Sequence, residues 1–251
     1  MKNFYVIIFL LVIFSCDNNS KQLIDKIYLD NNWTFNKVGE EDAYNAYVPG
    51  TIQTDLWKNK LISDPYYGCN EIDLQWIGES DWCYKSKFVL KEEDLIKDNI
   101  SIVFEGLDTY AKVILNGTIL LNANNMHHKW VVPCKEILVS GENTIEIVFE
   151  SPVKYYEKDS INLDYQIPGG KWAYSRKAAY HYGWDWAPSF LTMGIIKPIY
   201  LILWDSHYPK DFYFTTVNVE PNKATLKLSF DIESKIKEEA NIKISQKGRN
   251  N

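Results

Sequence analysis

Hydrophobic and polar residues alternate over short stretches of the chain that are rich in β-branched and aromatic side chains and bounded by Gly, Asn or Pro. A two-residue period is typical of strands with one buried face. We expect strands at residues 82–90, 101–105, 111–115, 118–121, 143–150 and 197–204. The pair Asn116-Gly117 separates two of them and predicts a tight hairpin turn, because both central positions of such a turn need positive φ. The pattern predicts an all-β sandwich.

One segment of this β-rich chain has a helical period instead. Within residues 51–59, Ile52, Leu56 and Trp57 fall on one face of a helix. Thr51 is placed to cap its first turn. We expect one short helix here and no other helix of any length.

The pattern changes after Trp204. Residues 206–210 are typical of a linker. Three further strands are expected at residues 212–219, 224–232 and 240–245. Three strands do not complete a sandwich. We therefore expect a first domain over residues 25–205 and a second, incomplete β domain over residues 206–251.

The first residues have the features of a bacterial export signal. Lys2 precedes an apolar run that is too short to span a bilayer and ends at Cys16. Residues 12–16 resemble a lipobox, in which the Cys is lipidated and becomes the new N-terminus; the alternative is an ordinary signal peptide with a chance Cys. We expect residues 1–16 to be a lipoprotein signal peptide, residues 17–24 to be a tether, and the protein to be periplasmic or at the cell surface.

Composition and charge exclude several classes of protein. A hydrophobic content of 46% and an aromatic content of 15% predict a folded core. The net charge of -6 has mixed signs and offers no basic stripe, so we expect no nucleic-acid partner.

The cysteines and histidines do not form a metal-binding pattern. Cys69, Cys83 and Cys134 lack metal-ligand spacing and are expected to be isolated buried thiols. The adjacent His127 and His128 are expected in a solvated loop. We therefore expect no metal.

Four sequence blocks carry a family resemblance, and their order along the chain also matches. They lie at residues 48–77, 104–117, 176–188 and 192–199, and they include Val48-Pro49-Gly50-Thr51, Leu115-Asn116-Gly117 and Gly183-Trp184-Asp185-Trp186. Together they resemble the sugar-binding domain of glycoside hydrolase family 2 β-mannosidases, and the last motif separates these from the β-galactosidases and β-glucuronidases of the broader family. The resemblance implies a galactose-binding-like jelly-roll sandwich followed by part of an immunoglobulin-like sandwich.

The motif around Asp185 holds the candidate site. Sugar recognition needs an aromatic surface against the ring C–H groups and polar groups that accept hydrogen bonds from hydroxyls. The resemblance implies that Trp184 and Asp185 reach a mannosyl-binding pocket, where Asp185 accepts hydrogen bonds from the sugar. The alternative is that the tryptophans are core residues and Asp185 caps a turn. Arg176, His181 and Trp186 lie nearby and either contact substrate or support the loop.

Two positions beside this motif depart from the family pattern. Ala187 stands where the family usually has Gly, and Ser189 stands where it commonly has Arg. If the turn requires positive φ at the first of these positions, Ala187 strains it. For the cationic or titratable side chains Arg176, Lys177 and His181 we expect structural roles.

No pair of catalytic carboxyls is expected in this chain. Retaining glycosidases use two carboxyls about 5–5.5 Å apart. The resemblance implies that both are Glu residues of a (β/α)₈ barrel, for which the chain contains no sequence, and that no metal or organic cofactor is needed. The pair Asn70-Glu71 looks like an acid/base motif, but it lies inside the first block, and we interpret Glu71 as a carboxylate that anchors a turn or loop.

The main functional hypothesis is a fragment of a retaining exo-β-mannosidase that releases terminal mannose from β-mannosides, and the chain alone is expected to be inactive. Two alternatives stay open. One is a surface-tethered carbohydrate-binding sandwich without hydrolysis, and the other is a decayed gene product without function. The expected partners are a β-mannoside or other glycan and a membrane reached through the lipid anchor, while the oligomeric state stays open.

Overall fold

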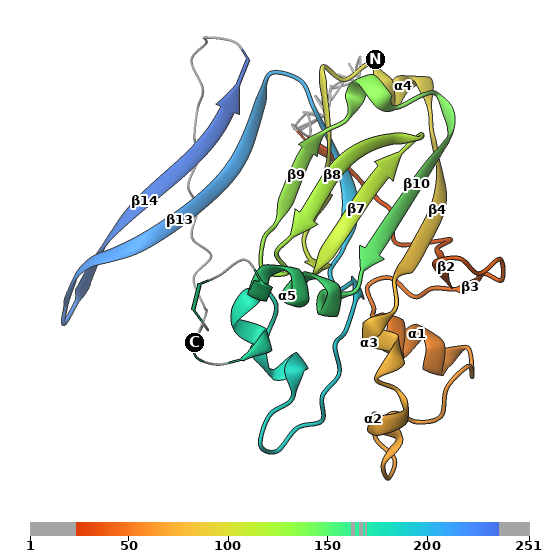
Figure 1. Ribbon diagram of the computed structural model, residues 1–251. Coiled ribbons are helices and arrows are strands. Elements are labelled where there is room, and N and C mark those ends of the chain that lie inside the picture. The colour runs from red at the N-terminus through yellow and green to blue at the C-terminus, as the bar shows by residue number, and fades with distance from the viewer. Residues whose placement is uncertain (1–23, 162–163, 166–167, 169, 236–251) are drawn as a thin grey trace, which may run out of the picture.

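The structure, a computed structural model, describes residues 24–161, 164–165, 168 and 170–235. Two antiparallel sheets face each other (Figure 1). The larger sheet has, in spatial order, β3 (Tyr44–Asn45), β2 (Thr34–Lys37), β4 (Trp82–Leu90), β10 (Gly141–Glu150), β7 (Tyr110–Leu115) and β8 (Thr118–Asn124). The smaller sheet has β1 (Ile24–Tyr28), β12 (Ile199–Trp204), β5 (Asn99–Phe104) and β9 (Trp130–Pro133), and a short pair joins β6 (Leu107–Asp108) to β11 (Gly194–Ile195). The predicted β-sandwich is confirmed.

The core lies between the two sheets and is filled by alternate side chains of each strand. Ile145, Ile147 and Phe149 of β10 are buried, and the residues between them are more exposed. They belong to one hydrophobic cluster with Phe104 of β5 and Leu201 of β12. Each fully buried side chain of this size contributes about 1.5–3 kcal/mol. The strand β1 pairs along its whole length with β12, so the first and last strands of the sandwich are neighbours.

The hairpin predicted at Asn116-Gly117 joins β7 to β8. The two residues have φ values of 48° and 79°, as this type of turn requires. The side chain of Asn116 adds a second constraint, because its Oδ1 accepts a hydrogen bond from the Thr144 backbone N–H at 2.8 Å and its Nδ2 donates to the Ile137 carbonyl at 2.8 Å. The turn is thus tied to the neighbouring strand β10.

The predicted helix is α1 (Ile52–Lys58), and the side chain of Thr51 accepts a hydrogen bond from the Thr54 backbone N–H as its N-cap. The expectation of no other helix is wrong. The structure also contains α2 (Asn70–Asp73), α3 (Trp76–Glu79), α4 (Glu92–Leu95), α5 (Pro152–Ile161) and the 3₁₀ turns η1 (Lys135–Ile137), η2 (Lys171–Tyr174) and η3 (Ala179–Tyr182). Most of these are single turns, which are too short to display a helical period.

The ten-residue helix α5 is the clearest omission from the sequence prediction. Pro152 occupies its first position, where the missing N–H costs nothing, and Ser151 Oγ accepts a hydrogen bond from the Val153 backbone N–H at 3.2 Å. The helix contacts α3 and η2 at one end of the sandwich. Its sequence mixes polar and apolar residues without a clear stripe, so the period that reveals an amphipathic helix is weak.

After the sandwich, β13 (His207–Glu220) and β14 (Lys223–Ser234) form a long hairpin that extends to the side (Figure 1). The strands predicted at residues 212–219 and 224–232 lie within it and are confirmed. The strand predicted at residues 240–245 lies outside the described residues. In the described part of the chain the hairpin is a two-stranded sheet, so the β character of this region also agrees with the prediction.

The predicted linker at residues 206–210 is wrong, because β13 already begins at His207. Tyr208 is buried and its ring stacks on that of Trp204 with centroids 5.7 Å apart. The last strand of the sandwich and the start of the hairpin are therefore held together by an aromatic contact that a composition rich in Pro and polar residues does not reveal.

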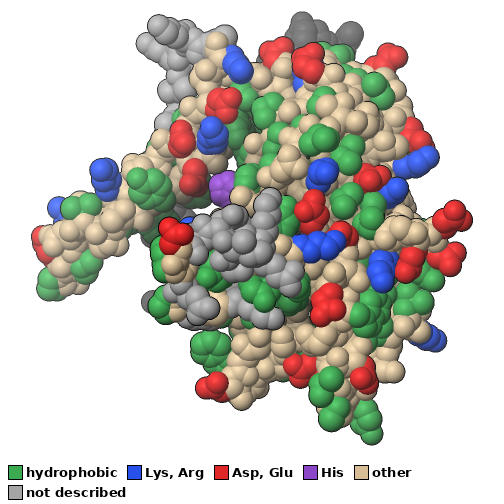
Figure 2. All heavy atoms as spheres, viewed as in Figure 1, with side chains coloured by type: hydrophobic (Ala, Val, Ile, Leu, Met, Phe, Trp, Pro, Cys, Tyr) green, Lys and Arg blue, Asp and Glu red, His purple; other side chains and the backbone are tan. Residues whose placement is uncertain are grey.

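Hydrophobic side chains lie along one face of this hairpin. Phe212 pairs with Phe230 across the two strands, and Phe214 pairs with Leu228. Phe212 and Phe214 are each 66% exposed, and Figure 2 shows hydrophobic side chains on the surface of the hairpin. The same alternation that fills the core of the sandwich thus leads to an exposed apolar face here.

The three described cysteines are free thiols. Cys83 and Cys134 are buried as expected, and burial raises the pKa of each to about 12, which makes them poor nucleophiles. The expectation is wrong for Cys69, which is exposed. Cys16 and the predicted signal and tether lie outside the described residues, and none of the helices that are described is long and apolar enough to cross a membrane.

Candidate functional site

The candidate site lies at one end of the sandwich. Between α5 and β11 the chain makes a long excursion through η2 and η3, and α1, α2 and α3 lie at the same end (Figure 1). We call residues 170–192 the site loop, because they contain Trp184 and Asp185.

A tight turn forms the tip of the site loop. The Trp184 backbone N–H donates to the Ala187 carbonyl at 3.3 Å, and the Ala187 N–H donates back to the Trp184 carbonyl at 3.2 Å. Asp185 and Trp186 are the two central residues. Gly183, directly before the turn, has a φ of 101°, whereas Ala187 is not among the positive-φ residues. The departure from Gly at position 187 therefore introduces no backbone strain.

The side chains of this turn face solvent. Trp184 is 52% exposed and Trp186 is 83% exposed, so the interpretation of these tryptophans as core residues is wrong. Asp185 is exposed as well, and its carboxylate has no hydrogen bond or ion pair with the described part of the chain. The turn thus presents an indole surface beside an unpaired carboxylate.

A buried ion pair holds the base of the site loop. Lys177 Nζ lies 2.6 and 2.7 Å from the two carboxylate oxygens of Asp108 and donates to the Thr192 carbonyl at 2.6 Å, and the charged side chains have no exposed surface. Burial lowers the pKa of Lys177, and the charge of Asp108 opposes this shift. Because Lys177 is enclosed by these partners, it holds the loop and cannot contact a ligand.

His181 is attached to the same cluster. Its Nδ1 lies 3.2 Å from Thr192 Oγ1 and 4.0 Å from Asp108 Oδ2. Burial and the charge of Lys177 lower the pKa of His181 to about 4, so its imidazole is neutral near pH 7. The Thr192 hydroxyl donates its proton to Asp108 at 2.6 Å, which makes Nδ1–H of His181 the donor to Thr192. The geometry therefore gives His181 a role in supporting the loop.

Arg176 and the two other histidines are placed differently. The Arg176 carbonyl accepts a hydrogen bond from the Met126 N–H at 3.1 Å, while its side chain is exposed. His127 and His128 are exposed, as expected of a solvated loop. In the described part of the chain, no group of three or more His, Cys, Asp or Glu side chains is placed to hold a metal ion.

The other side of the site loop is tied to α1 and α2. Glu71 accepts a hydrogen bond from the Ser189 backbone N–H, and Gln75 Nε2 donates to the Ser189 carbonyl at 2.9 Å. Gln53 Nε2 donates to the Leu191 carbonyl at 3.0 Å. Glu71 is therefore a loop anchor, as the sequence indicated, whereas the two glutamines were missed because their partners are 114 and 138 residues away.

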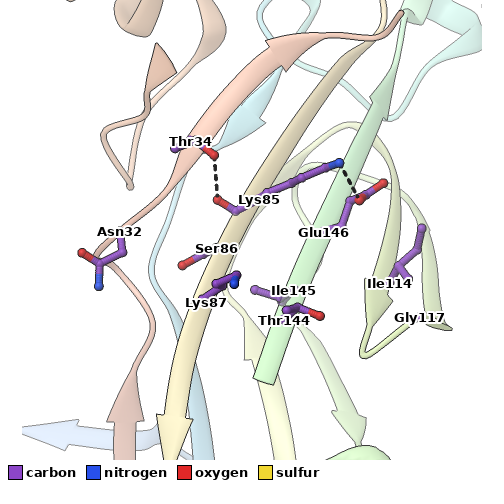
Figure 3. A pocket seen from close by; sticks show the side chains of 10 residues that line it. All are labelled: Asn32, Thr34, Lys85, Ser86, Lys87, Ile114, Gly117, Thr144, Ile145 and Glu146. Carbon is purple, nitrogen blue, oxygen red and sulfur yellow. Dashed lines mark hydrogen bonds and ion pairs between the residues drawn. The ribbon is translucent and has the colours of Figure 1, made fainter. Parts of the chain in front are cut away.

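A cavity lies elsewhere, on the outer face of the six-stranded sheet. Its volume is about 710 Å³, and Figure 3 shows Lys85 of β4 directed at Glu146 of β10, which it meets at 3.1 Å. Thr34 Oγ1 donates to the Lys85 carbonyl at 3.4 Å. None of the described residues that line this cavity is aromatic, so it lacks a stacking surface for a sugar ring.

Comparison with known proteins identifies the family of this domain. The glycosyl hydrolase 2 galactose-binding domain-like family matches residues 33–197, which include the six-stranded sheet, β5 and β9 of the smaller sheet, and the whole site loop. The chain belongs to this family. Asp108, Lys177 and Asp185 lie within the matched residues. The β13–β14 hairpin lies after them.

Relatives of this domain carry a more specific name. The chain is 34% identical over 215 residues to "Beta-mannosidase B" of Thermothelomyces thermophilus, a match that covers 81% of the chain and 25% of that relative. A crystal structure of a β-D-mannosidase from Dictyoglomus thermophilum has a TM-score of 0.80 at 36% identity and is matched over 84% of this chain and 26% of its own. The chain thus spans about a quarter of the length of these β-mannosidases.

A more distant structure shows the fold alone. The β-D-glucuronidase from Dictyoglomus thermophilum has a TM-score of 0.55 at 17% identity, over 84% of this chain and 33% of its own. The sandwich is therefore common to a β-mannosidase and a β-glucuronidase, and any conclusion about the sugar has to come from the side chains of the site.

Proposed function

We propose that this chain is the sugar-binding part of a retaining exo-β-mannosidase and that Trp184 and Asp185 complete its mannosyl pocket. The observation that carries this proposal is the pairing of an exposed indole with an exposed, unpaired carboxylate on a loop that is fixed at its base. The similarity to β-mannosidases over 81% and 84% of the chain supports the choice of mannose.

The chemistry of the turn suits a pyranose. An indole packs against the C–H face of the ring, and a carboxylate accepts hydrogen bonds from its hydroxyls. A hydrogen bond to a charged acceptor contributes about 1.5–3 kcal/mol. Because Asp185 has no partner among the described residues to give up, sugar hydroxyls would replace water at this carboxylate.

Hydrolysis itself is assigned to a part of the enzyme outside the sandwich. In the proposed full enzyme, two Glu residues of a (β/α)₈ barrel about 5–5.5 Å apart act as nucleophile and acid/base, with no metal or organic cofactor. The chain is proposed to be exported by a bacterium and to be anchored in a membrane by a lipid on Cys16. The chain alone should not hydrolyse an aryl β-mannoside above the buffer blank.

Calorimetric titration of the purified chain with methyl β-D-mannopyranoside tests the sugar site. Asp185→Ala should weaken binding by about 10- to 150-fold, which corresponds to one or more lost charge-assisted hydrogen bonds. Asp211→Ala is the matched control, because Asp211 is also exposed but lies on the β13–β14 hairpin. Equal affinity of the Asp185→Ala variant and the unmodified chain would contradict the role of this carboxylate.

The second candidate function is a carbohydrate-binding module that acts without hydrolysis. One observation favours it: Asp108, Glu71 and Gln53, which hold the site loop, all belong to the sandwich, so the loop needs no other domain to form. A dissociation constant of the isolated chain well below about 1 mM would favour this module, and weaker binding would favour a pocket shared with a barrel.

A further inference from the structure

A small pocket lies behind the site loop, between α1 and the segment that leads to β11. It has a volume of about 110 Å³, and Gln53 and Trp57 of α1, Tyr66, Phe190 and Thr192 are among the residues that line it. The residues from 183 to 192 therefore border two features, the Trp184 turn at the tip and this pocket at the base.

Gln53 gives this pocket an unsatisfied polar group. Gln53 is only 7% exposed, and its Nε2 donates a hydrogen bond to the Leu191 carbonyl. Its Oε1 is buried and has no hydrogen-bond partner in the described part of the chain. Buried amide oxygens are nearly always paired, and leaving one unpaired destabilises a protein. A hydroxyl group that enters the pocket would supply the missing donor.

Exposed aromatic rings border the same pocket. Tyr66 is 75% exposed, and its ring meets that of Phe190 edge to face with centroids 5.5 Å apart. Trp57 on α1 is 47% exposed. Figure 2 shows hydrophobic side chains at the end of the molecule where α1 and α2 lie. Aromatic faces beside a hydroxyl acceptor form a surface that suits a pyranose, whose ring is apolar on its faces and polar at its edge.

The pocket and the turn lie on the same stretch of the site loop. Gly183, which precedes Trp184, is a spatial neighbour of Ser189, which precedes Phe190, because a Cβ placed on Gly183 would lie 3.4 Å from Ser189 Cβ. A ligand longer than one sugar unit can therefore extend from the turn toward Phe190 along the same loop.

We propose that this pocket is a second sugar subsite, in which Gln53 Oε1 accepts a hydrogen bond from a sugar hydroxyl and Tyr66 and Trp57 contact the ring of a further pyranose in a bound glycan. The volume is too small to enclose a whole pyranose, so only one edge of the ring enters. This inference rests on the proposed function for the identity of the first sugar, but the residues that carry it are different.

The test is an NMR titration of the chain with β-1,4-linked mannobiose and with methyl β-D-mannopyranoside. The indole N–H signals of Trp57 and Trp184 report the two positions separately, once single Trp→Phe variants have assigned them. Mannobiose should shift both signals, and Tyr66→Ala should weaken the response at Trp57 by about 2- to 10-fold. Tyr67→Ala, at a neighbouring residue with 76% exposure that is not among the lining residues, should have no effect.

Gln53→Met provides a second variant of similar size, which lacks Oε1 and also the Nε2 donor to the Leu191 carbonyl. It should reduce the mannobiose response at Trp57, whereas Tyr67→Ala should not. A response at Trp184 alone would overturn the subsite and leave the proposed function standing, whereas a response at Trp57 alone would support the subsite and count against the mannosyl role of Asp185. No response at either signal would overturn the subsite.

Discussion

Two buried carboxylates, one under the site loop and one in α1, have hydrogen-bond partners of different charge. Asp108, under the site loop, is paired with a buried cation, Lys177, and with Thr192. Asp55, in α1, has only neutral donors, namely the Tyr84 hydroxyl at 2.8 Å and the Tyr47 backbone N–H at 3.0 Å. Both residues have 0% exposure. The stability of the first arrangement depends on keeping the charges of Lys177 and Asp108 together. The stability of the second depends on whether Asp55 is protonated, and therefore on pH.

The effect of pH on Asp55 follows from its surroundings. Burial raises the pKa of Asp55 from 3.8 to about 6, although its two hydrogen bonds act in the opposite direction. The folded protein therefore binds a proton more tightly than the unfolded chain does between these pH values. Asp55 therefore increases the free energy of unfolding at low pH. This contribution is lost as the pH rises from 3.8 to about 6.

The largest expected effect is that of breaking the ion pair. Lys177→Met leaves Asp108 buried without its cation, and we expect it to lower the free energy of unfolding by about 3–5 kcal/mol. Urea denaturation followed by tryptophan fluorescence measures this. Lys87→Met is the control, because Lys87 pairs with Glu142 at 2.8 Å on the surface and should contribute less than about 1 kcal/mol. Similar losses in both variants would contradict the distinction between the buried and the exposed pair.

Asp55→Asn should remove the contribution of Asp55 to the pH dependence of stability. Asn keeps an oxygen for the Tyr47 N–H and has no charge to bury. Between pH 4 and 6 the unmodified chain should lose stability from this group, on the order of 3 kcal/mol, and the variant should not. The measurement is the urea midpoint at half-unit pH intervals. If the two pH profiles have the same slope in this range, the raised pKa of Asp55 is refuted.

His181→Asn should have a pH effect of opposite sign. The pKa of His181 falls from 6.5 to about 4 in the folded state, so the unfolded chain binds the extra proton, and stability from this group rises with pH between these values. The expected contribution is on the order of 2–3 kcal/mol. Because Asp55 and His181 act in opposite directions, Asp55→Asn should make stability rise more steeply with pH between pH 4 and 6, and His181→Asn should make it fall more steeply.

The smallest expected effect concerns the turn at the tip of the site loop. Ala187→Gly should lower the free energy of unfolding by only about 0.4–1 kcal/mol, because Ala187 already has an ordinary φ and Gly adds freedom to the unfolded chain. Thermal unfolding can detect this change. A gain in stability would mean that Ala187 is strained after all.

The sequence predicted the features that depend on neighbours along the chain. Strand alternation predicted β4 at residues 82–90, turn chemistry predicted the positive φ angles at Asn116 and Gly117, and a capping residue predicted α1. These signals are local, because a side chain's face and a turn's backbone are set within a few residues.

The anchors of the site depend on partners far away in the sequence. Lys177 and Asp108 are 69 residues apart, and Thr192 and Asp108 are 84 residues apart. Neither a period nor a spacing indicates that these side chains meet. The resemblance to a family identified the exposed tip of the loop, while the buried cluster beneath it became visible only when the sheets were assembled.

The pairing of β1 with β12 has a consequence for synthesis of the chain. Tyr28, the end of β1, is paired with Tyr200, so β1 cannot complete its sheet until the ribosome has added the intervening residues. At about 5–20 residues per second this takes roughly 9–35 s. During that time β1 and the edge of β5 that β12 will join lack their partners, and a nascent chain in this state exposes apolar residues that a chaperone can bind.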